Sequence, residues 1–286
     1  MTTGGVTRYV RFTQGGRTSY GIREGATIRE LEGDLFANPR PTGRTASVSA
    51  VKLEVPVDPL RVKKVIGVAG NWNMPDRPPR VPGAHPRVFA KFATGLVPHE
   101  AEVEQPPECK QLHHQAELVV VIGRQGRYIS REEANDYIFG VTVGNDVSDE
   151  TYYGEPDGVK NPGRIISKAC DTWAPLGTDI VAGLDYHDLG IEARLDGEVV
   201  SKGRTSEMLY GVEKVVSAMS HYLTLMPGDL FYMGSPPWYP GKRDMFAGQT
   251  IECEIEGIGV LRNKIVAMQN VIPDPWWKKE EAKVTA

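Results

Sequence analysis

Short runs of β-branched and aromatic residues, each closed by glycine, aspartate or proline, recur along most of this 286-residue chain. The clearest are RVFAKF, ELVVVIG, YIFGVTVGNDV, IEARLDGEVV, DLFYMGSP and QTIECEIEGIGVLRNKIV, and shorter runs of the same kind fill the first fifty residues. They predict strands, because branched and aromatic side chains pack well on a pleated sheet while Gly, Asp and Pro end one. We therefore expect a mostly β protein, with about nine strands in a mixed sheet or barrel.

Helical patterns are scarcer. In SREEANDYIFG, Ser130 and Glu133 have the spacing of a capping box, which predicts the start of a helix. A second helix is expected between Ser206 and Leu223, where apolar residues recur at helical spacing: Met208, Leu209, Val212, Val216 and Met219. The expected class is thus α+β with strands predominating.

The length predicts one large core with an appendage, since single cores become rare beyond roughly 250 to 300 residues. Residues 51–59 read as a proline-punctuated connector between a β-rich start and a new buried strand. We expect a small N-terminal domain with its connector over 1–58, a main domain over 59–270 and an exposed tail over 271–286.

Composition excludes several classes of partner. A formal charge of −4 gives no field that would collect nucleic acid. The longest apolar stretches are strand-sized, far below the ~20 residues of a membrane-spanning helix, and no apolar segment follows the N-terminal charges as in a secretory signal. The three cysteines lie far apart and match no zinc spacing. We expect a cytoplasmic protein that acts on a small molecule, with no nucleic-acid or membrane partner.

Polar residues gather at the entrance of the strand LHHQAELVVVIG. Side chains alternate along a strand, so His113, Gln115 and Glu117 would share one face over about 13 Å. This row is either a metal-binding strand or a solvated strand end.

A second polar cluster, GNDVSDE, follows the apolar run IFGVTV. Its oxygen donors suit a hard divalent ion such as Mg²⁺, although Asn and Asp also close turns through purely local hydrogen bonds. These donors are Asn145, Asp146, Asp149 and Glu150.

Charged residues within apolar stretches add further candidates. Lys168 and Asp171 in IISKACDTWAPLG either form a structural ion pair or have a functional role. In the functional interpretation, the Lys168 cation stabilises an oxyanion or enolate and Asp171 is its partner. Lys91 in RVFAKF is either solvated or functional, and Ser235 in FYMGSPPW either closes a turn or approaches a ligand. Residues 73–86 hold five prolines and cannot lie inside a sheet or helix, so we expect a lid or binding loop there.

In order and spacing these pieces resemble the fumarylacetoacetate hydrolase family, from about Lys64 to Ile265. The matching segments are VIGVAGNW, VFAKF, QAELVVVIG, GVTVGNDVS, SKACDTWAPLG, LDGEVVSKGRTSEMLY, LTLMPGDLFYMGSP and GQTIECEIEGIGVLRN. Residues 1–50 are similar to the small N-terminal domain that many members carry. The resemblance implies a β-roll core, a homodimer, and one Mg²⁺, Mn²⁺ or Ca²⁺ held by three acidic residues.

The resemblance also implies the chemistry. Members act on 2-oxo acids or 1,3-dicarbonyl compounds such as acylpyruvates; most hydrolyse a C–C bond, and others decarboxylate, isomerise, dehydrate or tautomerise. A divalent ion gripping two substrate oxygens would stabilise the enolate that all of these reactions form, and Lys168 would add a second positive charge near the oxyanion.

Carried over residue by residue, the metal site departs from the family pattern. Glu117 matches the second residue of the family's Glu-x-Glu strand and Asp146 the Asp of Asn-Asp-Val-Ser, but Gln115 stands at the first Glu. An amide oxygen binds Mg²⁺ without bringing charge, so this exchange weakens the site. His113, which would favour Zn²⁺, Mn²⁺ or Fe²⁺, and Glu150 are the candidates for a replacement ligand.

The lid departs from the family pattern as well. Asn71 and Trp72 match the strand end that precedes the lid, but the His and Glu that activate water in many hydrolytic members do not follow directly. Asp76 and His85 are the candidate general bases, with His85 favoured by its intrinsic pKa, and Glu150 is a further candidate.

Substrate contacts are also implied by the resemblance. They are expected from Lys91, Asn71, Trp72, Ser235 and Asp171. Many members continue the Asn-Asp-Val-Ser turn with an Arg that receives the substrate carboxylate; here Asp149, Glu150 and Thr151 follow, which disfavours a carboxylate at that spot.

Three functions follow as hypotheses. The first is a metal-dependent hydrolase that cleaves a C–C bond in a 1,3-dicarbonyl or acylpyruvate-like substrate. The second is an isomerase, decarboxylase or dehydratase of the same fold, which needs a stabilised enolate but no attacking water. The third is a binding protein that has lost its catalytic activity.

Overall fold

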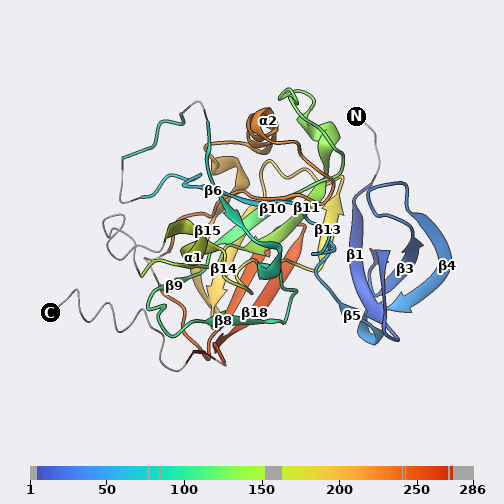
Figure 1. Cartoon of the computed structure of the whole chain (residues 1–286), viewed down its shortest axis with the longest axis horizontal. Coiled ribbons are helices and arrows are strands. Elements are labelled where there is room, and N and C mark those ends of the chain that lie inside the picture. The colour runs from blue at the N-terminus through green and yellow to red at the C-terminus, as the bar shows by residue number, and fades with distance from the viewer. Residues whose placement is uncertain are drawn as a thin grey trace.

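The computed structural model describes residues 5–75, 78–83, 85–151, 163–239, 241, 243–269 and 271–272. Within these residues the protein is mostly β with mixed parallel and antiparallel pairing, which confirms the expected class (Figure 1). An 11-stranded sheet follows the order β4-β3-β2-β1-β13-β11-β10-β16-β6-β7, with β5 paired to β1, and a five-stranded sheet follows the order β15-β14-β17-β18-β8. Strands β9 and β12 form a separate two-stranded pair.

The N-terminal part is an antiparallel meander. Its strands are β1 (Thr7–Gln14), β2 (Arg17–Glu24), β3 (Thr27–Glu32), β4 (Arg40–Ser47) and β5 (Lys52–Leu53), with the 3₁₀ turn η1 (Val48–Ala50) before β5. In Figure 1 these strands lie together on one side of the molecule. They are not a detached module, because β1 pairs with β13 (Asp179–Ala182) of the main part, from Thr7 opposite Ala182 to Val10 opposite Asp179.

The centre of the large sheet is buried on both faces. In β10 (Ala116–Ile122), Leu118, Val120 and Ile122 enter one hydrophobic cluster while Val119 and Val121 enter another on the opposite face. This explains why the sequence is a continuous apolar run rather than an alternating one. The other strands that flank the site are β6 (Val65–Ala69), β7 (Arg87–Lys91), β11 (Ile138–Asn145) and β16 (Leu230–Tyr232).

The smaller sheet packs against β10 and β11 of the large sheet and so closes the core. Its strands are β8 (Glu102–Gln105), β14 (Gly190–Leu195), β15 (Glu198–Arg204), β17 (Thr250–Ile255) and β18 (Gly259–Ala267). The run IEARLDGEVV folds as a hairpin, because Asp196 and Gly197 adopt the positive φ angles, 51° and 83°, that a tight two-residue turn requires.

Both predicted helices are shorter than expected. Helix α2 (Val212–Tyr222) buries the face formed by Val212, Val215, Val216 and Met219, but Met208 and Leu209 precede it, after the 3₁₀ turn η4 (Thr205–Glu207). The capping box forms, since the Glu133 N–H donates to Ser130 Oγ and the Ser130 N–H to Glu133 Oε2.

Only the 3₁₀ turn η3 (Ala134–Tyr137) follows that capping box. The predicted helix ends there because β11 begins at Ile138, which pairs with Ile122 of β10. Sheet pairing therefore overrides the local helical signal. The remaining short elements are α1 (Gly163–Lys168), η2 (Ala93–Gly95), β9 (Leu112–His113) and β12 (Ser148–Asp149). None of the helices in the described part of the chain has the length and apolar content to span a bilayer.

Candidate active site

A cavity of about 440 Å³ opens where the ends of β6, β7, β10 and β11 meet α1 and the segment after β16. Five residues named from the sequence as metal or catalytic candidates line it: Gln115, Glu117, Asp146, Glu150 and Lys168. Gln115 and Glu117 lie at the start of β10, Asp146 and Glu150 directly follow β11 and β12, and Lys168 ends α1. The fold thus brings together positions up to 53 residues apart in the chain.

Asp146 lies between two ammonium groups. Lys91 Nζ donates to Asp146 Oδ1 at 2.6 Å and Lys168 Nζ to Asp146 Oδ2 at 2.5 Å. All three side chains are buried. A carboxylate held on both oxygens by cations has a fixed orientation, so Asp146 is a preorganised anchor at the cavity floor.

The charges in this cluster shift one another's proton affinity. Burial alone would raise the pKa of Asp146, but the Lys168 and Lys91 ammonium groups outweigh it and hold the pKa below its usual value. Burial, and then the negative charge of Asp146, raises the pKa of Glu117 well above its usual value. Burial lowers the pKa of Lys91, against the pull of Asp146. Two carboxyl groups whose pKa values are shifted in opposite directions therefore face one cavity.

Lys168 bridges two of the proposed metal ligands. Besides Asp146, its Nζ donates to Gln115 Oε1 at 2.6 Å, and it lies 4.8 Å from the centre of the Phe89 ring. Glu117 Oε2 accepts a hydrogen bond from the Gly234 N–H at 2.7 Å. Glu117 is therefore oriented by the backbone N–H of Gly234 and not by the Ser235 hydroxyl.

The donor set suits a hard cation, but only in part. In the described residues no three His, Cys, Asp or Glu side chains are grouped as metal ligands; the oxygens available at this cavity are the carboxylates of Glu117 and Asp146 and the amide of Gln115. Oxygen ligands of this type fit Mg²⁺, Mn²⁺ or Ca²⁺. The ammonium of Lys168 contacts two of the same oxygens, so a bound cation would have to displace it from at least one.

His113 lies away from these ligands. The strand is interrupted between β9 and β10, so the alternation expected from His113 through Glu117 does not continue. His113 is fully buried, with Nδ1 3.2 Å from Glu150 Oε1 and Nε2 2.6 Å from Asp244 Oδ1, and its ring meets Trp238 edge-on. Neither nitrogen has the alignment of a hydrogen bond. His113 thus approaches the cavity through Glu150 and Trp238, which both line it.

Two expected substrate contacts have structural roles, and a third lies outside the cavity. Lys91 Nζ uses its three donors on Asp146 Oδ1, Val147 O and Lys168 O. Asn71 lines the cavity, but its amide bonds the backbone of Tyr210 on both sides and donates to Met233 O. Asp171 is exposed and does not line the cavity, and the partner of Lys168 is Asp146 instead.

Trp72 and Ser235 do line the cavity, as expected. The Nε1 of Trp72 is buried and has no hydrogen-bond partner among the residues that the structure describes. Asp76 lies outside the described residues.

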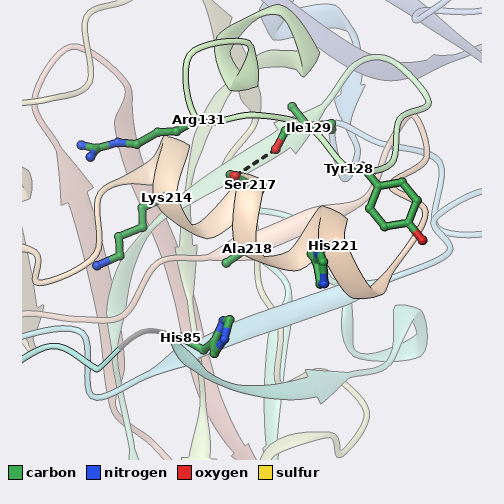
Figure 2. A pocket seen from close by; sticks show the side chains of 8 residues that line it. All are labelled: His85, Tyr128, Ile129, Arg131, Lys214, Ser217, Ala218 and His221. Atoms are coloured by element: carbon green, nitrogen blue, oxygen red, sulfur yellow. Dashed lines mark hydrogen bonds between the residues drawn. The ribbon is translucent and has the colours of Figure 1, made fainter.

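His85 faces a different part of the molecule. It lines a second hollow of about 390 Å³ beside α2, together with residues from the loop before η3, and Figure 2 shows it below the helix on the side of His221. Its Nε2 lies 3.4 Å from the Tyr222 hydroxyl, and its backbone oxygen accepts from the Tyr210 hydroxyl at 3.2 Å. In this arrangement His85 does not reach the cavity that holds Glu117 and Asp146.

Several cavity residues were missed by the sequence reasoning. They include Arg80, Arg87, Phe89 and Arg164. One signal was available for two of them: Arg87, Phe89 and Lys91 are alternate residues of β7, so they lie on one face of that strand.

Comparison with known proteins adds independent findings. Residues 65–266 match the model of the fumarylacetoacetate (FAA) hydrolase C-terminal domain, and residues 7–56 match an Rv2993c-like N-terminal model. The mitochondrial oxaloacetate tautomerase Fahd2a of Rattus norvegicus is 32% identical over 267 residues, covering 90% of this chain and 79% of its own.

Solved structures are similar along most of the chain. A 2-hydroxyhepta-2,4-diene-1,7-dioate isomerase from Mycobacterium marinum has a TM-score of 0.79 at 31% identity, over 92% of this chain and 100% of its own. A maleylpyruvate hydrolase from Sphingobium sp. SYK-6, solved with manganese(II) and pyruvate, has a TM-score of 0.72 at 22% identity over the same shares, which shows a common fold.

Proposed function

The chain belongs to the fumarylacetoacetate hydrolase family, and from that membership we propose that it is a divalent-cation-dependent enzyme that converts a 2-oxo acid or 1,3-dicarbonyl compound through an enolate. The observation that carries the proposal is the arrangement around Asp146: two carboxylates, an amide oxygen and the Lys168 ammonium share one cavity. Members of this family are enzymes, and a relative of the same fold was solved with manganese.

Glu117, Asp146 and Gln115 are the residues proposed to hold Mg²⁺ or Mn²⁺. When bound, the ion would supply Lewis-acid stabilisation of the enolate oxygens. Lys91 would keep Asp146 ionised and oriented, and the Gly234 N–H would orient Glu117.

Lys168 is proposed to stabilise the developing oxyanion. Its ammonium is buried against the Phe89 ring, where little water competes for it, and such a preorganised charge is worth more than one in solvent. An entering 2-oxo acid could take over the hydrogen bonds that Lys168 now gives to Gln115 and Asp146.

Isomerisation or tautomerisation is the reaction we favour over hydrolysis. Both need a proton moved between carbon and oxygen of a stabilised enolate, with no attacking water. His85, the base expected for water activation, lies in the second hollow. Relatives near 30% identity carry the names of an oxaloacetate tautomerase and a dienedioate isomerase, which supports this choice.

Hydrolysis of a C–C bond is the second candidate, and one contact favours it. Glu150 lines the cavity and approaches the buried imidazole of His113. A carboxylate beside an imidazole can orient and deprotonate water, and this pair would then replace the dyad missing from the lid.

Metal dependence is tested by exhaustive chelation and by Glu117→Ala. We expect chelation to abolish turnover of an oxaloacetate-like 2-oxo acid and added Mn²⁺ to restore it, while Glu117→Ala lowers turnover by at least about a hundredfold. Full activity after chelation, or no binding of Mg²⁺ or Mn²⁺ at millimolar ion by calorimetry, would contradict the proposal. Glu252→Ala, in β17 of the five-stranded sheet and outside the cavity lining, is the matched control.

Reaction in ¹⁸O-labelled water separates the two candidates. Label in a newly formed product carboxylate, detected by mass spectrometry, supports hydrolysis. An isomer or tautomer without a new carboxylate supports the favoured reaction.

A further inference from the structure

Two arginine side chains converge on one point at the rim of the active-site cavity. A Cβ atom added to Gly70 would lie 1.8 Å from Arg80 Nη1 and 2.9 Å from Arg87 Nη2. Both arginines line the cavity that contains Glu117 and Asp146. The two guanidinium groups therefore lie close together beside Gly70, the residue that follows β6.

Arg80 is held in this place by its own backbone and by Gly70. The Arg80 N–H donates to Asn73 Oδ1 at 2.8 Å, and Arg80 Nη1 donates to Gly70 O at 3.1 Å. Gly70 has a φ of 62°, which turns the chain, and its missing side chain leaves the space that the guanidinium fills. One of the five N–H donors of Arg80 is used by this carbonyl, which leaves most of the fork for another acceptor.

The adjacent charges lack a counter-ion in the part of the chain that the structure describes. Neither Arg80 nor Arg87 has a carboxylate within ion-pair distance there, whereas arginines elsewhere, such as Arg194 and Arg204, are paired with Glu or Asp. Two like charges brought together repel each other, and an anion between them removes that cost. Paired guanidinium groups at a cavity mouth are a geometry suited to a carboxylate.

Strand β7 relates this rim to the enolate site. Arg87, Phe89 and Lys91 occupy alternate positions on one face, spaced roughly 7 Å apart. Lys91 reaches Asp146 at the floor, and Phe89 packs under Lys168 midway along the strand. A substrate carboxylate at Arg87 would thus be several bonds away from an oxo group at Lys168. It would therefore not be the carboxylate that is bonded directly to that oxo carbon.

We propose that Arg80 and Arg87 form a subsite for a second, distal carboxylate, so that the substrate is a 2-oxo dicarboxylate. The subsite rests on the proposed function, since it presumes that the 2-oxo acid end lies at Glu117, Asp146 and Lys168.

The test compares acids that differ only in the distal carboxylate. Binding of 2-oxoadipate and 2-oxohexanoate is measured by calorimetry with saturating Mn²⁺, and the pair 2-oxoglutarate and 2-oxopentanoate repeats the comparison one carbon shorter. We expect the wild-type protein to bind at least one dicarboxylate about tenfold or more tightly than its monocarboxylate.

Substitutions locate the effect. Arg80→Gln and Arg87→Gln should each reduce that preference and together abolish it, with affinity for the monocarboxylates unchanged; Arg87→Lys should keep part of it. Arg131→Gln, in the second hollow of Figure 2, makes the same charge change away from the cavity and should keep the full preference.

Two results would overturn the subsite while leaving the proposed function intact. One is equal affinity within both pairs of acids, and the other is a preference that survives the double substitution. Binding of none of the four acids would instead contradict the proposed function, and the subsite with it.

Discussion

At the residue scale, the decisive arrangement is a carboxylate fixed by two lysines. Asp146 receives an ammonium on each oxygen, and Lys91 has no donor left for a substrate. Lys91 is therefore a positioning residue, and Lys168, which lines the cavity, is the one of these two lysines that a substrate can meet.

Gln115→Glu should tighten binding of the divalent ion. A third carboxylate adds a charge that the amide lacks, so the Kd for Mn²⁺ should fall by about tenfold or more. Titration followed by electron paramagnetic resonance of free Mn²⁺ measures it. Gln269→Glu makes the same change at an exposed site and should leave the Kd unaltered; an unchanged Kd in Gln115→Glu would argue against Gln115 as a ligand.

Lys91→Met should lower the free energy of unfolding by about 2–4 kcal/mol, because it leaves Asp146 with one cation and two buried carbonyl groups without their donor. Urea unfolding monitored by circular dichroism gives the value. Lys52→Met, at an exposed lysine, is the control, and equal stability of the two variants would count against the positioning role.

Much of this site was predictable from the sequence, because Glu117, Asp146 and Lys168 stand where apolar elements end. That all three donors of the Lys91 ammonium are already used was not predictable, since their acceptors lie 55, 56 and 77 positions further along the chain. The convergence of Arg80 and Arg87 was equally hidden, because it depends on the approach of both side chains to Gly70.

At the element scale, one side chain decides where the regular pairing of β10 begins. The Gln115 N–H donates to Asn145 Oδ1 at 2.9 Å, and the Asp146 N–H donates to Gln115 O at 2.9 Å. A side-chain acceptor thus stands where a ladder carbonyl would be, and regular pairing begins only at Ala116. Alternation alone could not predict this break, and so it placed His113 on the face of Gln115 and Glu117.

Strand β3 carries a pH-dependent contact in the N-terminal meander. Glu30 accepts hydrogen bonds from Arg44, Ser19 and Arg17, and the hydrogen bond from Arg44 is the main cause that lowers the pKa of Glu30 to about 2. A depressed pKa stabilises the folded state at pH above the unfolded value of 4.5, and this stabilisation is lost as the pH falls towards 2.

Glu30→Gln should therefore lower the Tm at pH 6, with a difference from wild type that shrinks below pH 4.5 and vanishes near pH 2. Differential scanning calorimetry across this range measures it. Glu32→Gln, at the exposed neighbour, should show little pH-dependent difference; a constant gap for Glu30→Gln at all pH values would refute the linkage.

At the scale of the whole molecule, the sequence predicted two parts but not how they join. Its strand-forming runs identified both the β-rich start and the main core. The junction depends on β1 pairing with β13, residues about 170 positions apart, and no local pattern encodes such a partner. Buried Asp179 reinforces this junction by accepting from Arg8 and Arg23 of the meander.

Asp179→Ala should weaken the junction. The loss of a buried carboxylate shared by two half-exposed arginines should cost about 1–3 kcal/mol, and amide hydrogen exchange should rise in β1 and β13 before the rest of the sheet. Asp179→Asn keeps an acceptor and should show a smaller effect. Unchanged exchange in both strands would show that backbone pairing alone holds the parts together.

The pairing of β1 with β13 also lets the N-terminal meander cover an edge of the main sheet. Without β1, strand β13 would end the row β13-β11-β10 and present unpaired N–H and C=O groups along its outer side. Open strand edges are templates on which other chains add strands, the first step towards aggregation. The N-terminal strands therefore act as a shield for the catalytic sheet, and selection against self-association would preserve them even where they contribute nothing to the cavity.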